Sequence, residues 1–277
     1  MVKINKQLFL SIIFFSALSS FAQNKQLSLY DAVLNGSIRT TRIGNAGWVK
    51  GVNIAHFTLP ENGNKLLFYN ADNNTLDTSF NFGEFQFFTA VALGDTISRL
   101  PRVSFKDSTS FYFNFKGAKY LYQMSTRKAE KIITLPRAQA MEYHEGSNHL
   151  AYVEGNNLFV KNGDVEPVQL TKDGGRGIVY GQAVHRYEFG ITKGLFWSES
   201  GSKLAFYRMD ESMVTDYPIY NFADTPASVR NIKYPTSGAR SHHVTVGVYD
   251  FDTKKTVYLK TGGDPESFLT NITFDAE

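Results

Sequence analysis

Short apolar and aromatic runs recur along the chain and are separated by clusters of Asn, Asp, Gly and Ser. The clearest runs lie at residues 65–69, 111–115, 120–122, 149–153 and 203–207. The polar clusters contain the residues that tolerate positive φ or form side-chain turns. Only residues 27–34, with Gly36 placed to end the helix, show the spacing of a short amphipathic helix. The pattern therefore predicts an antiparallel all-β protein with one short helix at most.

A strand pair repeats along the chain. Each copy has a first strand with an aromatic residue, a polar turn, and a second strand that ends near another aromatic residue. The second aromatics are Phe68, Phe113, Tyr152 and Phe206, at intervals of 45, 39 and 54 residues. A period of about 40–50 residues with four short strands per unit is typical of β-propeller blades. We expect a partial β-propeller of about four to five antiparallel four-stranded blades, with an irregular β-sandwich as the alternative.

The first 22 residues have the three-part layout of a secretory signal. Lys3 and Lys6 are followed by an almost purely apolar run at residues 8–18, and Ser20 and Ala22 supply the small residues of a cleavage site. The alternative, a membrane anchor, needs about 20 apolar residues. We expect a signal peptide cut after Ala22 and an exported, periplasmic protein.

Composition excludes several classes of protein. The 277 residues contain no Cys, which rules out disulfides, thiolate metal sites, a cysteine nucleophile and a lipoprotein anchor. The net charge of +3 comes from 29 basic and 26 acidic residues without a basic block, so nucleic-acid binding is not expected. No run after residue 22 is long enough to span a membrane.

The number of units indicates an incomplete ring. We expect residues 23–50 to form an entry segment and residues 51–277 to form the N-terminal part of the propeller. Common rings of this kind have six to eight blades, and closure hides their sheet edges. Residues 269–275 have the pattern of a first strand of a further blade. The sequence therefore predicts a piece of a longer protein.

Three blocks in the second half carry a resemblance to a known family. They are Val-His-Arg-Tyr-Glu-Phe-Gly-Ile at 184–191, the segment 194–212 with Leu-Phe-Trp-Ser and Lys-Leu-Ala-Phe-Tyr-Arg-Met-Asp-Glu-Ser, and Tyr-Pro-Thr-Ser-Gly-Ala-Arg-Ser-His-His-Val at 234–244. Their order and spacing resemble the N-terminal propeller of the dipeptidyl peptidase IV family, prolyl-oligopeptidase-type serine peptidases, in its Bacteroidetes-like form. The similarity is clearest over residues 170–271.

The resemblance implies an activity and a binding site. Members of the family remove X-Pro or X-Ala dipeptides from peptides with a free N-terminus, and an acidic segment of an irregular eight-bladed propeller binds the α-amine. Here Tyr187 and Glu188 match that segment, whereas the family usually presents two adjacent Glu. Tyr can donate or accept a hydrogen bond but has no charge at neutral pH. We expect Glu188 to bind the amine, with an ordinary surface carboxylate near Arg186 as the alternative.

The chain offers no catalytic residues of its own. Gly-x-Ser-x-Gly, the motif of a nucleophile elbow, is absent, so the resemblance implies that a C-terminal α/β-hydrolase domain outside these 277 residues carries the Ser-Asp-His triad. His242 and His243 are adjacent and point to opposite faces if they lie on a strand, which favours a structural role over metal binding. No metal or other cofactor is expected.

Two loop segments complete the sequence predictions. Residues 173–177 are rich in Gly but precede no helix, so we expect a connection between blades instead of a phosphate-binding loop. Residues 210–235 are too long for a turn within a blade and are a candidate insertion at a homodimer contact. Besides the peptidase, two functions remain open: a non-catalytic periplasmic propeller that binds or scaffolds, and another peptidase of the same clan that does not require a free amine.

Overall fold

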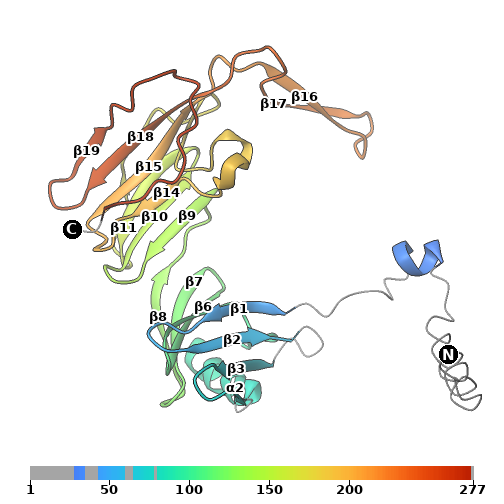
Figure 1. The fold of residues 1–277 in the computed structure, drawn as a ribbon, viewed down its shortest axis with the longest axis vertical. Coiled ribbons are helices and arrows are strands. Elements are labelled where there is room, and N and C mark those ends of the chain that lie inside the picture. The colour runs from blue at the N-terminus through green and yellow to red at the C-terminus, as the bar shows by residue number, and fades with distance from the viewer. Residues whose placement is uncertain (1–27, 35–42, 60–64, 78–79, 276–277) are drawn as a thin grey trace, which may run out of the picture.

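The computed structural model describes residues 28–34, 43–59, 65–77 and 80–275. These residues form a two-stranded hairpin and four larger antiparallel sheets that follow one another along an open arc (Figure 1). The first three sheets each contain four strands in chain order. The first is made of β1 (Gly44–Trp48), β2 (Ile54–Thr58), β3 (Leu66–Asn70) and β4 (Thr75–Asp77). The second is made of β5 (Val103–Asp107), β6 (Ser110–Phe115), β7 (Ala118–Gln123) and β8 (Lys128–Thr134). The third is made of β9 (Ala140–His144), β10 (His149–Glu154), β11 (Asn157–Asn162) and β12 (Val168–Gln169).

The fourth sheet has a less regular order. It contains β13 (Ile178–Tyr180), β14 (Leu195–Trp197), β15 (Lys203–Asp210), β18 (His243–Asp250) and β19 (Lys255–Tyr258). Both β13 and β14 pair with β15, and β15 pairs with β18 over its whole length. Between β15 and β18 the chain forms a separate hairpin of β16 (Asp216–Asn221) and β17 (Ser228–Lys233), which projects away from the sheets (Figure 1). A short segment with a largely non-helical backbone, η4 (His185–Gly190), connects β13 to β14.

The tight turns follow from the polar residues between the strands. Asn74, Asn148 and Asn156 have φ angles of 56°, 57° and 62°, in the left-handed region that Asn adopts more readily than most side chains. They lie in the β3–β4, β9–β10 and β10–β11 turns. Such turns hold strands in antiparallel register. The prediction of antiparallel four-stranded units is confirmed for the first three sheets, whereas the fourth has five strands.

The hydrophobic core lies mainly between neighbouring sheets. Leu66 and Phe111 belong to a cluster shared by the first and second sheets, and Ile133 and Leu150 to one shared by the second and third. Leu158, Leu204 and Phe206 belong to a cluster shared by the third and fourth sheets. Within the described ranges no strand joins the first sheet to the fourth, so the arc is not closed into a ring.

The predicted strand pair occupies different places in the sheets. It forms the two middle strands, β2 and β3, of the first sheet, but the first two strands, β5–β6 and β9–β10, of the next two. In the fourth sheet it forms β14 and β15. The first sheet also includes β1, within the residues expected as an entry segment.

The expectation of one short helix at most was wrong. Helix α2 (Phe82–Leu93) runs for 12 residues between the first and second sheets. The side chain of Asn81 accepts a hydrogen bond from the amide of Glu84 at 3.1 Å, and Gly94 ends the helix at a φ of 66°. Apolar residues surround almost the whole helix, so the sequence has no polar face to reveal a 3.6-residue period. Near the N-terminus only one turn, η2 (Tyr30–Leu34), is described, and Gly36 lies outside the described residues.

The C-terminal segment also differs from its prediction. Residues 269–275 form no strand, because no described residue offers them a backbone ladder. Instead, Leu269, Ile272 and Phe274 pack against a cluster in the fourth sheet, and the hydroxyl of Tyr207 donates a hydrogen bond to the carbonyl of Leu269 at 2.7 Å. In the described part of the chain, no helix has the length and apolar character to cross a membrane. The predicted signal peptide lies outside the described residues.

Candidate functional site

The two predicted site residues lie in η4, a segment with an unusual backbone. His185, Arg186, Tyr187 and Phe189 all have φ angles between 50° and 65°, in the left-handed region. For residues with a Cβ this conformation costs energy, and it persists only where the surroundings impose it. Glu188 interrupts the run with an extended backbone, at φ −69° and ψ 160°. A segment of this kind is a candidate functional site because its strain must be offset by other contacts.

Tyr187 and Glu188 are both exposed to solvent. The Tyr187 side chain is 69% exposed, and the carboxylate of Glu188 makes no hydrogen bond or ion pair with any residue that the structure describes. Arg186, two residues away, does not pair with Glu188. Its guanidinium donates a hydrogen bond to the carbonyl of Lys233 and lies over the ring of Tyr234, 4.9 Å from the ring centroid. The Glu188 carboxylate is therefore available to a cation from outside.

A buried histidine pair, His185 of η4 and His242, holds η4 on its buried side. His185 and His242 are 3% and 4% exposed, and Nε2 of His242 lies 3.1 Å from Nδ1 of His185. The backbone amide of His185 also donates to Nε2 of His242, at 3.2 Å. The His185 ring stacks on Phe268 with 4.0 Å between centroids, and Phe189 meets the edge of the same Phe268 ring at 5.3 Å. Packing of this kind can offset the strain in the backbone above it.

The hydrogen bonds fix the tautomers of the pair. Because Nε2 of His242 accepts from a backbone amide, it carries no proton, and Nδ1 of His185 must be the donor to it. Nε2 of His185 is then an acceptor, and it has no partner among the described residues. Burial lowers the pKa of both rings, that of His242 to about 4, where the neighbouring His185 contributes in the same direction. Both imidazoles are neutral at neutral pH.

A cleft of about 590 Å³ adjoins η4 and the base of the β16–β17 hairpin. Arg186 and Tyr187 line it from η4, Arg230 and Lys233 from the hairpin, and Glu211 from the loop after β15. Burial raises the pKa of Glu211, and Arg186 and Lys233 act against that shift. The cleft brings η4 and the hairpin, far apart in sequence, to one site.

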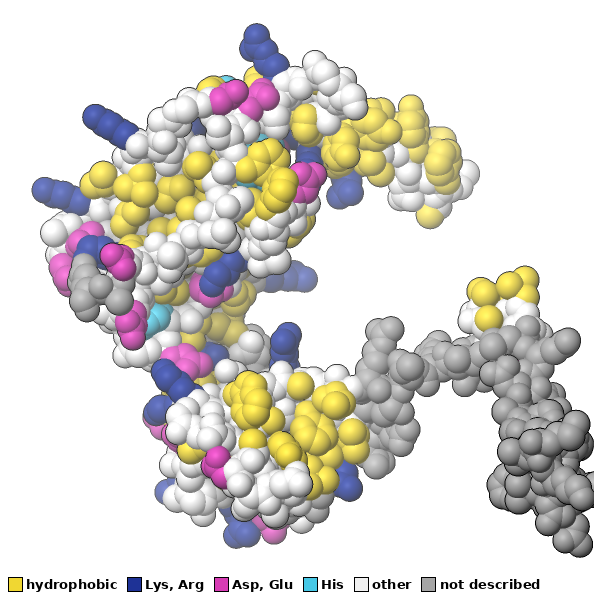
Figure 2. Space-filling view, in the orientation of Figure 1, with side chains coloured by type: hydrophobic (Ala, Val, Ile, Leu, Met, Phe, Trp, Pro, Cys, Tyr) yellow, Lys and Arg dark blue, Asp and Glu magenta, His cyan; other side chains and the backbone are white. Residues whose placement is uncertain are grey.

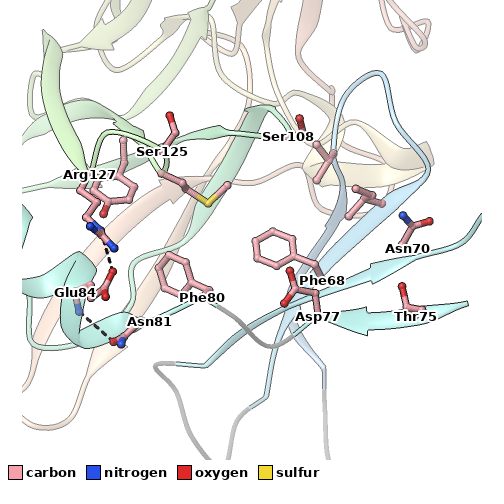
Figure 3. Close-up of a pocket in the computed structure, with 14 residues that line it drawn as sticks. Phe68, Asn70, Thr75, Asp77, Phe80, Asn81, Glu84, Ser108, Ser125 and Arg127 are labelled. Atoms are coloured by element: carbon pink, nitrogen blue, oxygen red, sulfur yellow. Dashed lines mark hydrogen bonds and ion pairs between the residues drawn. The ribbon is translucent and has the colours of Figure 1, made fainter. Parts of the chain in front are cut away.

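A second cleft, of about 650 Å³, lies on the first sheet and α2 (Figure 3). Phe68 and Phe80 give it an apolar wall, and Asp77 and Glu84 are its carboxylates. Glu84 is bound to Arg127, with 3.0 Å between Oε2 and Nε, as the dashed line in Figure 3 marks. Its charge is thus already balanced, and no predicted site residue lines this cleft.

The other sequence predictions have these outcomes. His242 is the buried partner of His185, and no group of three or more potential metal ligands occurs in the part of the chain that was described. Residues 173–177 connect the third sheet to the fourth, as predicted. Residues 210–235 contain the projecting hairpin, which carries exposed apolar side chains (Figure 2). These side chains are Tyr217, Ile219, Tyr220, Phe222 and Val229.

Sequence reasoning missed the contacts of Arg186 and His185 with distant parts of the chain. Their partners lie 47 and 57 residues away, at Lys233 and His242. The only signal in the sequence was that His185, Arg186 and His242 stand in two of the blocks that carry the family resemblance, at 184–191 and 234–244, with Lys233 directly before the second block. Such a grouping indicates proximity but does not identify the contacting atoms.

The comparison with known families matches this fold. The profile described as "Dipeptidyl peptidase IV (DPP IV) N-terminal region" matches residues 101–277. A protein of Fusarium vanettenii named probable dipeptidyl-aminopeptidase B is 28% identical over 182 residues, which are 57% of this chain and 20% of that protein. Its counterpart from Pyrenophora tritici-repentis is 34% identical over 132 residues, 42% of this chain and 15% of that protein. The chain thus spans about a fifth or less of the length of these relatives.

Two solved structures have a similar fold. One, from Bacteroides ovatus and described as a dipeptidyl aminopeptidase IV, has a TM-score of 0.71 and 29% identity, over 87% of this chain and 33% of that one. The other, dipeptidyl peptidase 4 of Porphyromonas gingivalis, has a TM-score of 0.66 over 91% of this chain and 37% of that one; at 18% identity it supports the fold alone. With the family profile covering more than half of the chain, these residues belong to the dipeptidyl peptidase IV N-terminal region family.

Proposed function

We propose that this chain is the N-terminal propeller part of an exported dipeptidyl peptidase IV-like serine exopeptidase. A C-terminal α/β-hydrolase domain supplies the catalytic triad, and the enzyme releases X-Pro or X-Ala dipeptides from peptides with a free N-terminus. In this proposal Glu188 binds the α-ammonium group of the substrate, and Tyr187 lines the same place. The propeller part also limits access to the catalytic domain.

The observation that carries the proposal is the state of Glu188. Its carboxylate is exposed and without a partner in the described residues, yet it belongs to a segment held by the buried contacts of His185. An ammonium group that leaves water loses hydration, and a carboxylate in a fixed position restores it through a charge-assisted hydrogen bond. Anchoring the amine also fixes the distance to the peptide bond, so one carboxylate can set the length of the released fragment.

Tyr187 gives this site a weaker anchor than a pair of carboxylates. The phenol can hydrogen-bond an ammonium group but does not balance its charge at neutral pH. Of Tyr187 and Glu188, only Glu188 supplies a negative charge to balance the ammonium group. Loss of Glu188 should leave almost no preference for a charged N-terminus.

The test is the kinetics of Glu188→Gln in the full-length protein. With Gly-Pro-p-nitroanilide as substrate, we expect kcat/KM to fall at least about tenfold, which corresponds to about 1.4 kcal/mol of transition-state binding. Glu154→Gln, which removes an exposed carboxylate from the third sheet, is the matched control and should change kcat/KM less than about twofold. If kcat/KM falls less than tenfold in Glu188→Gln, Glu188 does not bind the α-ammonium group of the substrate.

Two independent experiments test the requirement for a free amine and the export of the protein. N-acylated Gly-Pro-p-nitroanilide should not be cleaved; cleavage would favour a peptidase that requires no free amine. No cleavage of either substrate by the wild-type full-length protein would favour the non-catalytic binding module. For export, mass spectrometry of the mature protein should find Gln23 at the N-terminus.

A further inference from the structure

We propose that Arg186 is a positioning residue through which the β16–β17 hairpin holds Glu188 in place and keeps its carboxylate free for the substrate. The inference rests on the function proposed above for Glu188. It assigns a role in substrate binding to a hairpin that is distant from Glu188 in sequence.

The backbone of η4 needs a restraint on each side. Four of its non-glycine residues have positive φ, at a cost of about 1–3 kcal/mol each. Its own backbone contributes little: the amide of Tyr187 donates to the carbonyl of Val184 at 3.2 Å, and that of Ile191 to the carbonyl of Glu188 at 3.1 Å. On the buried side the restraint is His185, packed on His242 and Phe268. On the exposed side the restraint is Arg186.

Arg186 joins η4 to the end of β17. Its guanidinium combines the hydrogen bond to the carbonyl of Lys233 with the stacking on Tyr234. A planar guanidinium can make both contacts at once, and a Lys ammonium cannot reproduce the combination. Only Tyr187 separates Arg186 from Glu188, so a displacement of Arg186 displaces the carboxylate.

The partner atoms on the hairpin are themselves well fixed. Nζ of Lys233 donates to the carbonyl of Val214 at 2.8 Å and lies 3.3 Å from Oδ1 of Asp216. The amide of Tyr234 donates to the carbonyl of Thr215 at 3.1 Å, and the hydroxyl of Thr215 donates back to the carbonyl of Tyr234 at 3.2 Å. The base of the hairpin is thus a rigid support for Arg186.

The contacts of Arg186 with Lys233 and Tyr234, here called the clamp, also have an electrostatic consequence. A free guanidinium two residues from a carboxylate can form an ion pair with it and so compete with the substrate ammonium. Engagement with Lys233 and Tyr234 keeps the Arg186 side chain away from Glu188. The clamp therefore contributes to the position of Glu188 and to its availability.

The test is a double-mutant cycle in the full-length protein with Gly-Pro-p-nitroanilide. Arg186→Met removes the clamp and should raise KM about fivefold or more with a smaller change in kcat. In a Glu188→Gln background the same change should have almost no further effect, because Arg186 acts through Glu188. A merely structural role would lower activity by the same factor in both backgrounds. Arg137→Met is the matched control, since the exposed Arg137 side chain, between β8 and β9, lines neither cleft and makes no hydrogen bond or ion pair with the described residues.

Variants on the hairpin side cover the case in which Arg186→Met does not fold. Tyr234→Ala should raise KM as Arg186→Met does, and Tyr234→Phe, which keeps the ring, should restore the wild-type value. If Glu188→Gln lowers kcat/KM more than tenfold but Arg186→Met and Tyr234→Ala act additively with it, the role of Arg186 is refuted and the proposed function stands. If Glu188→Gln has no such effect, the proposed function and this inference are both refuted.

Discussion

Protonation of the buried histidine pair should destabilise the protein in acid, and His242→Gln should remove most of that effect. Nε2 of His242 accepts hydrogen bonds from the backbone amide and from Nδ1 of His185. A proton on this nitrogen would replace an acceptor with a donor and break both bonds. Gln in place of His retains an acceptor but does not titrate.

The size of the effect follows from the pKa of His242. Burial, followed by the charges of His185, Arg186 and His243, lowers that pKa from 6.5 to about 4, and Glu266 acts in the opposite direction. The unfolded chain therefore binds a proton at His242 below pH 6.5, whereas the folded chain binds it only when the pH falls to about 4. Stability is complete above pH 6.5 and is lost as the pH falls toward 4. At about 1.4 kcal/mol for each pKa unit, the loss is about 3 kcal/mol.

The measurement is the free energy of unfolding in urea of the full-length protein between pH 7.5 and 4.5. The difference in free energy of unfolding between wild type and His242→Gln should shrink as the pH falls. The contributions of carboxylates that titrate in both proteins cancel in this difference. His243→Gln, which removes the adjacent imidazole, is the control and should keep most of the wild-type slope, since burial contributes more than the His243 charge to the lowered pKa of His242. Parallel curves for wild type and His242→Gln would show that this ring does not control acid stability.

Two further predictions concern the packing that supports the arc. Phe85→Ala should lower the free energy of unfolding by about 3–5 kcal/mol, because the Phe85 ring is fully buried among Phe111, Phe113 and Tyr122. Phe87→Ala, at a side chain that is 63% exposed, should lower it by less than about 0.5 kcal/mol; equal losses for the two variants would contradict the packing of α2 through Phe85. Gly247→Ala should cost about 1–3 kcal/mol, because the new Cβ would lie 2.4 Å from Cζ of the buried Phe206, while Gly175→Ala meets no atom within 4 Å; a Gly247→Ala protein that melts at the wild-type temperature would contradict this reasoning.

The strand pairs could be predicted from the sequence because their signals are local. Alternating or continuous apolar runs and turn-forming Asn and Gly act within ten residues of each other, and they identified β5–β6 and β9–β10. Helix α2 was missed because the same local signal fails for a helix that is apolar on nearly every side. The strand predicted at residues 269–275 failed for another reason: a strand needs a neighbour, and the pattern of one segment does not reveal whether a neighbour is there.

The candidate site was predictable only in part. Glu188 and Tyr187 came from the resemblance of short blocks, and the structure places both side chains at the surface. The contacts of Arg186 and His185 could not be predicted, because they depend on where the hairpin and His242 lie after folding. Long-range contacts of this kind follow from the packing of the sheets, which the local pattern does not encode.

The residues of η4 differ in how much they contribute to its stability. His185 is buried and Arg186 is clamped, so these two residues offset the strain of the segment. Tyr187 and Glu188 make few contacts and contribute little to stability. We therefore expect that residues 187 and 188 can change without loss of the fold. By the same reasoning, a change at 187 or 188 should alter substrate binding with little effect on unfolding, and a change at 185 should affect both.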